Sequence, residues 1–272
     1  MSALTFRLKI ESRQRIDLSP LTPDKLAGKQ LADIEQIELQ CGNRKLRVNE
    51  TFEVSGEDAS DIVILNNTHD HMTKLDHIGS QMVAGRITVL GNAGDYTGFE
   101  MRGGQLIVQG NVEAYASCSM SGGFMHIQGN AGDFLGAAIA GNRQGMKGGT
   151  VIVTGNAGDR VGDQMRRGLM LIEGSAGDYC GSRMIAGTIG ILGGLGQYTA
   201  YAMRRGTLLL QETPALHTTI VDCGLHTLPF LNLMFKSFAG LPTRFAQLEQ
   251  NRVRRYAGDI ANDGKGEILV LQ

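Results

Sequence analysis

Hydrophobic and polar residues alternate over short stretches that return at a fixed interval along most of the chain. Segments such as Gln105–Gln109 (QLIVQ) and Thr150–Thr154 (TVIVT) carry apolar side chains at their second and fourth positions. This alternation is typical of β-strands with one buried face. The apolar pairs of the repeated segments are Ile87/Val89, Leu106/Val108, Met125/Ile127, Val151/Val153, Met170/Ile172, Ile189/Ile191 and Leu208/Leu210.

Glycine and methionine mark the same interval. An anchor glycine precedes each strand, at steps of 19, 19, 26, 19, 19 and 19 residues: Gly85, Gly104, Gly123, Gly149, Gly168, Gly187 and Gly206. A methionine lies three residues before each anchor: Met82, Met101, Met120, Met146, Met165, Met184 and Met203. Because seven of the 12 methionines share one phase, the chain contains an internal repeat.

The length of the repeat indicates the fold. Nineteen residues are too few for a βαβ crossover, but they suit one turn of a solenoid whose turns stack about 4.8 Å apart. We therefore predict an all-β protein, a right-handed parallel β-helix of 19-residue coils, with seven to eight coils over residues 56–211. Methionine should fill one corner of the interior. In turns such as Gly91–Asp95 (GNAGD), glycine and asparagine should supply positive φ.

The flanking segments are expected to cap the solenoid, because its end strands would otherwise be unpaired. Residues 1–55 are predicted to form a small α+β N-terminal cap, and residues 212–272 a C-terminal cap or partner-binding extension with a helix. The expected elements are strands over Leu4–Ile10, Lys45–Val54 and Ile268–Leu271, and helices over Pro23–Ala32 and Leu228–Phe238.

Two irregularities predict contact surfaces. The step of 26 contains seven extra residues near Ala137–Arg143, which should protrude as a loop that offers Asn142 and Arg143 to a partner. The outward third position of several strands is apolar, which indicates that another protein or a flanking segment covers it. This apolar stripe consists of Ile107, Ile152, Leu171 and Leu209.

Composition narrows the class of protein. Glycine accounts for 38 of 272 residues, about twice the usual share, while proline numbers only 5, which fits repeated special backbone positions rather than a disordered linker. A formal net charge of −1 gives no reason to expect nucleic acid or a membrane surface as a partner. The sequence has no apolar run of about 18 residues and no apolar leader at its start, so we expect a cytoplasmic protein.

Candidate chemistry is sparse. His69, Asp70 and His71, with Asp76 and His77 nearby, form the most metal-like cluster, but no fourth ligand is apparent and an exposed polar loop is the preferred interpretation. A polysaccharide-acting β-helix enzyme would carry paired carboxylates on neighbouring coils. The aspartates follow the turn glycines instead, where aspartate has a local hydrogen-bonding role, so we expect no catalytic residue and no metal site: Asp95, Asp133, Asp159 and Asp178.

Basic residues recur beside the anchor glycines and should stack into a ridge. They are Arg102, Lys147, Arg166, Arg167, Arg204 and Arg205. Like charges about 4.8 Å apart repel one another, which suggests that something neutralises them. The ridge is interpreted either as a track for an anion or as a solvated or ion-paired contact with a partner.

The repeated pattern GG-x-I-x-V-x-G-N-A-G-D resembles a glycine-rich β-helix of two families. It occurs around Gly103–Gly110, Gly129–Asp133 and Gly148–Asp159. One family is the C-terminal domain of the glutamate synthase large subunit, and the other is the C subunit of formylmethanofuran dehydrogenase. The tail, Arg255–Asp259 and Gly264–Leu269, resembles this C subunit, and above all its bacterial version in the formyltransferase/hydrolase complexes of methylotrophs.

This resemblance implies a noncatalytic structural subunit in a hetero-oligomer with a formyltransferase, an amidohydrolase-like subunit and a further subunit. Such a complex converts formyl-tetrahydromethanopterin to formate through a methanofuran-type carrier in formaldehyde oxidation. The carrier and tetrahydromethanopterin belong to the complex, and no cofactor is expected on this chain. The ridge could then meet an oligoglutamate tail of the carrier. The alternatives are the C subunit of an archaeal-type molybdenum or tungsten formylmethanofuran dehydrogenase, or a glutamate synthase-like β-helix module.

Overall fold

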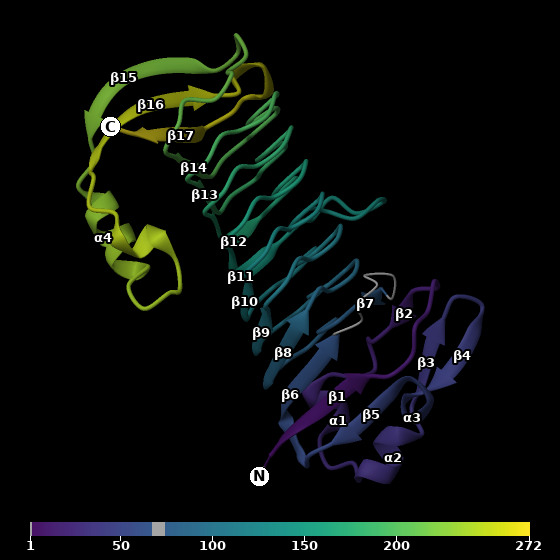
Figure 1. Ribbon diagram of the computed structural model, residues 1–272. Helices are drawn as coiled ribbons and strands as arrows, with labels where there is room; N and C mark the ends of the chain where they lie inside the picture. The colour runs from purple at the N-terminus through teal and green to yellow at the C-terminus, as the bar shows by residue number, and fades with distance from the viewer. Residues whose placement is uncertain (1, 67–73) are drawn as a thin grey trace.

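A stack of parallel strands forms the body of the molecule in the computed structural model, which describes residues 2–66 and 74–272 (Figure 1). The stack belongs to a 13-stranded sheet of order β15-β16-β17-β14-β13-β12-β11-β10-β9-β8-β6-β1-β5. Its repeat strands are β6 (Asp58–Asn66), β8 (Arg86–Gly91), β9 (Gln105–Val108), β10 (Phe124–Ile127), β11 (Lys147–Val153), β12 (Arg167–Ile172), β13 (Thr188–Ile191) and β14 (Thr207–Leu210). The predicted parallel β-solenoid is confirmed.

Equivalent residues of successive turns, here called rungs, pair in register. Leu106 pairs with Met125, and Met125 with Val151, so the inward positions form a continuous buried ladder. A second ladder of single bridges joins Ala93, Val112, Ala131, Ala157, Ala176 and Leu195. About six turns are therefore complete on both sides, fewer than the seven to eight coils that the periodicity predicted.

The repeat methionines pack onto the anchor glycines of the following rung, as the prediction of a filled corner required. A Cβ added to Gly149 would lie 2.7 Å from Met120 Cε, and one added to Gly168 would lie 2.8 Å from Met146 Cε. Gly149 also has a φ of 88°, which disfavours residues with a side chain. The anchor is thus restricted to glycine by both packing and backbone conformation.

The N-terminal segment covers the first edge of the stack. β1 (Ala3–Leu8) pairs in parallel with β6 and antiparallel with β5 (Phe52–Ser55). A four-stranded sheet of order β4-β3-β2-β7 lies in the same end of the molecule (Figure 1). The remaining elements of this end are β2 (Ile16–Asp17), α1 (Pro23–Leu26), α2 (Leu31–Glu35), β3 (Glu38–Cys41), β4 (Arg44–Arg47), α3 (Val48–Thr51) and β7 (Leu75–Asp76).

Two predicted N-terminal elements are wrong in detail. The helix expected over Pro23–Ala32 is broken, because α1 ends at Leu26 and Gly28 adopts a φ of 75° before α2 begins. The strand expected over Lys45–Val54 is interrupted by α3, in which the Glu50 side chain caps the backbone N–H of Arg47. A single glycine thus ends the first helix early, and local capping overrides the strand pattern of the second element.

The C-terminal segment closes the other end. β17 (Gly266–Leu271) adds in parallel to β14, and β16 (Arg252–Gly258) and β15 (Val221–Thr227) follow antiparallel. α4 (Phe230–Ser237) confirms the predicted helix over Leu228–Phe238, and it lies beside the stack in Figure 1. Two short 3-10 helices complete this segment, η1 (Arg244–Gln247) and η2 (Ile260–Asn262).

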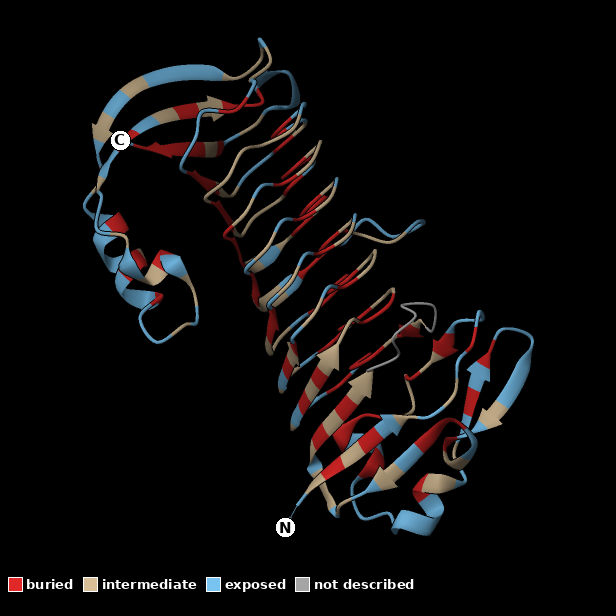
Figure 2. Cartoon of the chain, viewed as in Figure 1, coloured by how far each residue is buried: buried red, intermediate tan, exposed pale blue. Residues whose placement is uncertain are grey.

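The C-terminal segment also covers most of the apolar stripe. Ile152, Leu171 and Leu209 are fully buried in a second hydrophobic cluster. Figure 2 shows in red that buried residues recur along the strands of the stack. The residues that cover Ile152, Leu171 and Leu209 are Leu231, Phe235, Phe238, Phe245, Val253, Leu269 and Leu271. The flanking-segment alternative is therefore right for these three residues, and their assignment as partner-interface candidates is wrong. Ile107 lies outside this cluster and stays partly exposed.

None of the helices in the described ranges is long and apolar enough to cross a lipid bilayer.

Candidate functional site

A hollow in the solenoid wall arises from one irregular rung. The two residues after the repeat methionine are Arg166 and Arg167 on one rung and Arg204 and Arg205 two rungs later. The rung between them carries Ile185–Ala186 instead. The three rungs are consecutive, because the N–H groups of Arg166, Ile185 and Arg204 each bond to the preceding rung's methionine carbonyl. Shorter side chains between two arginine pairs leave a depression with cationic walls.

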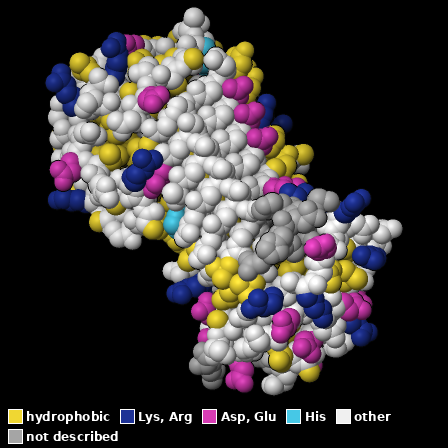
Figure 3. Space-filling model, in the orientation of Figure 1, with side chains coloured by type: hydrophobic (Ala, Val, Ile, Leu, Met, Phe, Trp, Pro, Cys, Tyr) yellow, Lys and Arg dark blue, Asp and Glu magenta, His cyan; other side chains and the backbone are white. Residues whose placement is uncertain are grey.

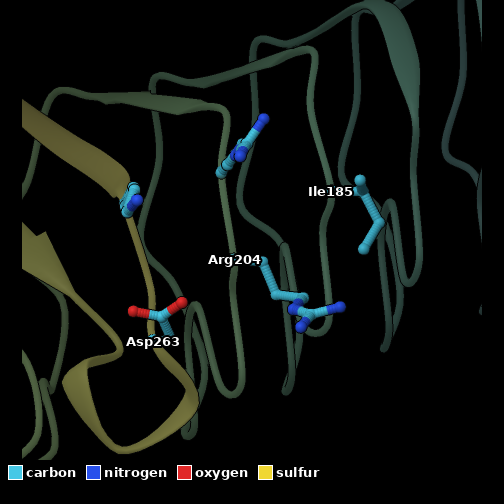
Figure 4. Close-up of a pocket in the computed structure, with 5 residues that line it drawn as sticks. Ile185, Arg204 and Asp263 are labelled. Atoms are coloured by element: carbon cyan, nitrogen blue, oxygen red, sulfur yellow. The ribbon is translucent and has the colours of Figure 1, made fainter.

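Two adjoining hollows share this depression, and we call them together the basic groove. One encloses about 490 Å³ and the other about 240 Å³, and Ile185 and Arg205 line both. The other lining residues are Gln144, Lys147, Arg166, Arg167, Ala186, Arg204, Asp263 and Lys265. Arg204 lies between Ile185 and Asp263 in the view of Figure 4.

The cations of the basic groove have little compensation from the chain itself. None of the ion pairs between described residues includes Lys147, Lys265 or any of the four arginines of the groove. Arg166 Nε is buried and has no hydrogen-bond partner in the described part of the chain, while its Nη2 reaches the Arg143 carbonyl only at 3.5 Å. A buried donor without an acceptor is uncommon, so the Arg166 Nε–H can donate one more hydrogen bond.

The structure brings five of the six predicted ridge residues together and leaves one apart. Arg102 is exposed but lines neither hollow, since the next rung carries Ser121 in place of a cation. Sequence reasoning missed Lys265, whose N–H bonds to the Arg204 carbonyl as β17 joins the stack. No periodic signal could have placed it there, because it comes from the nonrepeating tail.

The insertion borders the same groove. Met146 N–H bonds to the Gly136 carbonyl, and Ala138 N–H bonds to the Asp163 carbonyl, as Met101 and Glu100 do with the corresponding residues of a regular rung. The extra residues are therefore 139–145, shifted by two from the predicted position. Asn142, Arg143 and Gln144 are exposed on the loop, which projects away from the stack between β10 and β11 (Figure 1).

The turn aspartates and asparagines have structural partners. Asp133 and Asp159 each accept from the backbone N–H of the equivalent aspartate one rung on, at 2.8 Å. Asn111 and Asn130 do the same for the asparagine position, also at 2.8 Å. The predicted hydrogen-bonding role of aspartate is confirmed, but the bond links two rungs rather than closing its own turn.

The positive φ that the sequence predicted for the turns is present at Gly91, whose φ is 124°, but most of the turn glycines are required for a different reason. In Gly129–Asp133 and Gly155–Asp159, neither the glycines nor the asparagine adopt positive φ. A Cβ on Gly155 would lie 2.4 Å from Asn130 Oδ1, and one on Gly158 would lie 2.1 Å from Asp133 Oδ1. These positions need glycine because the side-chain ladders of the preceding rung fill the space.

Positive φ recurs at a ladder of stacked side chains. Tyr96, Tyr115 and Phe134 stack at ring-centroid distances of 5.0 and 4.7 Å, and each has a φ near 60°. Arg160 takes the next place and lies 4.6 Å from the centre of the Tyr179 ring. Ring stacking and this cation–π contact compensate the unfavourable backbone conformation.

The possible metal cluster finds no support. His69, Asp70 and His71 lie outside the described residues. Asp76 accepts hydrogen bonds from Arg15, and the His77 ring stacks on Tyr96 with centroids 4.9 Å apart. Within the part of the chain that the structure describes, no group of three or more His, Cys, Asp or Glu residues could hold a metal ion.

In the view of Figure 3, charged side chains gather toward the ends and edges of the molecule. The face of the solenoid seen in Figure 3 is largely uncharged between these regions. His126 is largely buried, and its Nε2 lies 3.2 Å from Thr154 Oγ1. Burial lowers the pKa of His126, while Glu173 opposes this shift.

Comparison with known proteins gives matches over the repeat region. A family model described as the GXGXG motif matches residues 73–222. The C subunit of the tungsten-containing formylmethanofuran dehydrogenase 2 of Methanothermobacter marburgensis is 36% identical over 99 residues, which is 35% of this chain and 36% of that protein. The equivalent protein of Methanococcus maripaludis is 34% identical over 98 residues. These matches span about a third of the relatives' length.

A solved structure matches over nearly the whole chain. A chain in the crystal structure of the formyltransferase/hydrolase complex (FhcABCD) from Methylorubrum extorquens with methylofuran is 37% identical, with a TM-score of 0.89. The match covers 98% of this chain and 99% of that one, so it includes both flanking segments as well as the repeat.

Proposed function

Because this chain belongs to the GXGXG motif family and, within it, to the C subunits of formylmethanofuran dehydrogenases and formyltransferase/hydrolase complexes, we propose that it is a noncatalytic structural subunit of a formyltransferase/hydrolase complex. The proposed reaction of the assembly is transfer of a formyl group from formyl-tetrahydromethanopterin to a methanofuran-type carrier, followed by hydrolysis to formate. In this proposal the transferase and the amidohydrolase-like chemistry belong to partner subunits.

One observation carries the proposal above all. Identity of 37% over 98% of the chain extends the likeness through both flanking segments, whereas the matches to the archaeal subunits cover only 35% of the chain. The flanking segments form the caps of a solenoid and do not follow its repeat, so a likeness there does not come from the repeat alone. The full-length match therefore favours the formyltransferase/hydrolase complex over the archaeal dehydrogenase and over a glutamate synthase module.

The internal structure supports a scaffold role. The interior of the solenoid is packed with ladders of Val, Ile, Leu and Met rather than hollowed into a site. The carboxylates and amides that repeat along its turns are committed to backbone N–H groups of the next rung. A rigid, regular stack of this kind holds partner surfaces at fixed separations.

The proposal includes the location and the small molecules of the complex. The matched crystal structure is of a complex with methylofuran, and we assign a methanofuran-type carrier and tetrahydromethanopterin to the assembly rather than to this chain. All four cysteines are free thiols, which fits a reducing compartment such as the cytoplasm.

Native mass spectrometry of the tagged chain, purified gently from its own cells, tests this proposal. We expect an assembly that contains a formyltransferase, an amidohydrolase-like subunit and a further subunit. Recovery of only a monomer or homo-oligomer would contradict it. Elemental analysis of the same sample distinguishes this complex from the alternative, because a stoichiometric content of molybdenum or tungsten would favour the archaeal-type dehydrogenase.

A further inference from the structure

We propose that the uncovered part of the outer sheet face holds one amphipathic α-helix of a partner subunit. This part, here called the open wall, consists of outward residues of β6, β8 and β9: Val63, Leu65, Thr88, Leu90 and Ile107. The inference rests on the proposed assembly, because it names the kind of element that another subunit contributes to it.

The open wall continues a stripe that the chain itself covers farther along the stack. Its central row runs in register through Val63, Thr88, Ile107, His126 and Ile152. Ile152 is fully buried under the C-terminal segment, whereas the residues of the open wall are only partly buried. Leu65 and Leu90 pair to form a second apolar row beside the first. Among the described residues, the four aliphatic side chains of the open wall belong to neither hydrophobic cluster, so they lack the cover that Ile152 has.

The open wall is three strands wide. On one side it meets β1, whose exposed Arg7 forms an ion pair with Glu53. On the other side it meets β10, where Phe124 packs against the cluster of the C-terminal segment. Strands lie about 4.8 Å apart, so three of them present a strip roughly 10–15 Å wide. An α-helix with its side chains is about 10–12 Å across, which means that the strip accommodates a single helix.

The cover of the neighbouring rungs favours a helix as the occupant. There, Leu231 and Phe235 of α4 and Phe245 of η1 are buried against the same face of the sheet. A helix satisfies its own backbone hydrogen bonds, whereas a strand laid on the wall would leave its edges unpaired. α4 also leaves Phe230 and Leu233 exposed by 44% and 70%, so the covering layer itself offers apolar surface to a further helix.

The polarity of the open wall favours an amphipathic helix over a charged segment. Its five residues are four aliphatic side chains and one threonine, and the exposed Gln105 and Gln109 flank Ile107 along β9. Asp61 and Arg86 are cross-strand neighbours of opposite charge on the rim. A highly charged chain would lose the hydration of its charges on this surface without gaining partners for them. A helix with one apolar stripe and polar flanks matches both the floor and the rim.

Site-specific cross-linking in the assembly tests the proposal. The photoreactive residue p-benzoylphenylalanine would replace Ile107, and in a second sample Leu90, in the tagged full-length chain produced in its own cells. Mass spectrometry would then identify the peptides cross-linked in the purified assembly. The control site is Val83, which is 52% exposed but lies outside the open wall. We expect both wall positions to cross-link to one segment of a partner subunit, with apolar residues at helical spacing, and the control site not to reach that segment.

A charge-insertion variant gives a second measurement. Leu90→Glu combined with Ile107→Glu should reduce the co-purified amount of the cross-linked subunit at least about tenfold, because the new carboxylates would be buried against an apolar helix. The control variant, Leu31→Glu combined with Val83→Glu, adds the same charge at exposed apolar sites outside the open wall and should retain that subunit. Circular dichroism and thermal unfolding of each variant establish that it is folded.

Four outcomes would overturn the proposal: cross-links from the wall to a second copy of this chain, cross-links to a segment without helical spacing, no cross-link from either position in an intact assembly, or equal loss of the subunit in both variants. Native mass spectrometry separates these outcomes from a failure of the scaffold proposal. An intact assembly without the expected cross-links refutes the helix on the open wall and leaves the scaffold role standing. A chain that is recovered without partner subunits refutes the scaffold role itself.

Discussion

Several glycines of the turns lie where the preceding rung leaves no space for a side chain. A Cβ on Gly177 would fall 2.1 Å from Asp159 Oδ1 and 3.0 Å from the Asp159 backbone nitrogen. The same Oδ1 accepts a hydrogen bond from Asp178 N–H, so it cannot move aside without breaking the ladder. Each such glycine therefore couples two turns, and an error at one position disturbs both.

We predict that Gly177→Ala lowers the free energy of unfolding by about 1–3 kcal/mol, as overpacking of a tight site does. Gly194→Ala is the matched control, because a Cβ there would meet no atom closer than Glu212 Oε2 at 3.6 Å and φ is not positive. The control should be neutral or slightly stabilising. Chemical denaturation of both variants checks this. Equal midpoints would show that the side-chain ladder accommodates the added methyl group without loss of stability.

We predict that His126 makes the free energy of unfolding sensitive to mild acid. Burial lowers the pKa of His126 in the folded chain below its ordinary value, so the folded state resists protonation. The unfolded chain takes up a proton near its ordinary pKa of about 6.5, and the folded state therefore loses stability as the pH falls below that value. In His126→Gln, the drop in unfolding free energy between about pH 7.5 and 5.5 should be smaller. Identical pH slopes for parent and variant would refute this.

At the scale of elements, the periodic part of the molecule is predictable and the rest is not. The strands follow from alternation, and the corner methionines follow from their spacing, because each rung meets an equivalent neighbour. Nothing in the sequence shows that Phe245 would fold back over β12 to β14, since that contact joins segments without a repeat. The sequence predicted the basic groove only in part for the same reason. Arg204 lies in phase with the repeat, whereas Lys265 comes from the nonrepeating tail.

Phe245 occupies a gap that the stripe leaves open. The stripe position of β13 is Gly190, and a Cβ there would lie 2.6 Å from Phe245 Cε1. The Phe245 ring thus fits between Leu171 and Leu209 and is fully buried. The Phe238 ring packs edge-on against it, with ring centroids 6.4 Å apart. The Phe245 ring therefore fixes the position of the C-terminal segment on the stack.

We predict that Phe245→Ala detaches this segment locally, with a cost of about 3–5 kcal/mol. Amide hydrogen exchange should speed up in α4 and η1, while β9 and β10 keep their protection. Binding of a hydrophobic dye should rise as Ile152, Leu171 and Leu209 become exposed. Phe230→Ala serves as the control, since that ring is 44% exposed and its loss should change little. Uniform exchange throughout the stack would mean that the segment and solenoid unfold together.

At the scale of the whole molecule, antiparallel strands end the sheet on both sides. β5 closes the edge next to β1, and β15 closes the edge beyond β16. Caps were expected on physical grounds, but their pairing was not, because β17 joins β14 only after a long excursion of the chain. With its edges paired, the stack offers partners mainly its walls, the insertion and the basic groove.

Deletion of the insertion is expected to leave the stack of strands intact, although it removes the hydrogen bond from Gly145 N–H to the Gln164 carbonyl. β10 and β11 pair in register on either side of it, with Phe124 opposite Thr150, and deletion of residues 139–145 restores the regular spacing of 19 residues. We predict that the deletion changes the free energy of unfolding by less than about 1 kcal/mol. Co-purification of the partner subunits should nevertheless fall, because Asn142 and Arg143 project from the solenoid. The double variant Asn142→Ala, Arg143→Ala keeps the loop and should weaken assembly to a lesser degree. If the deletion variant recovers all of its partners, the interface lies on another wall of the stack.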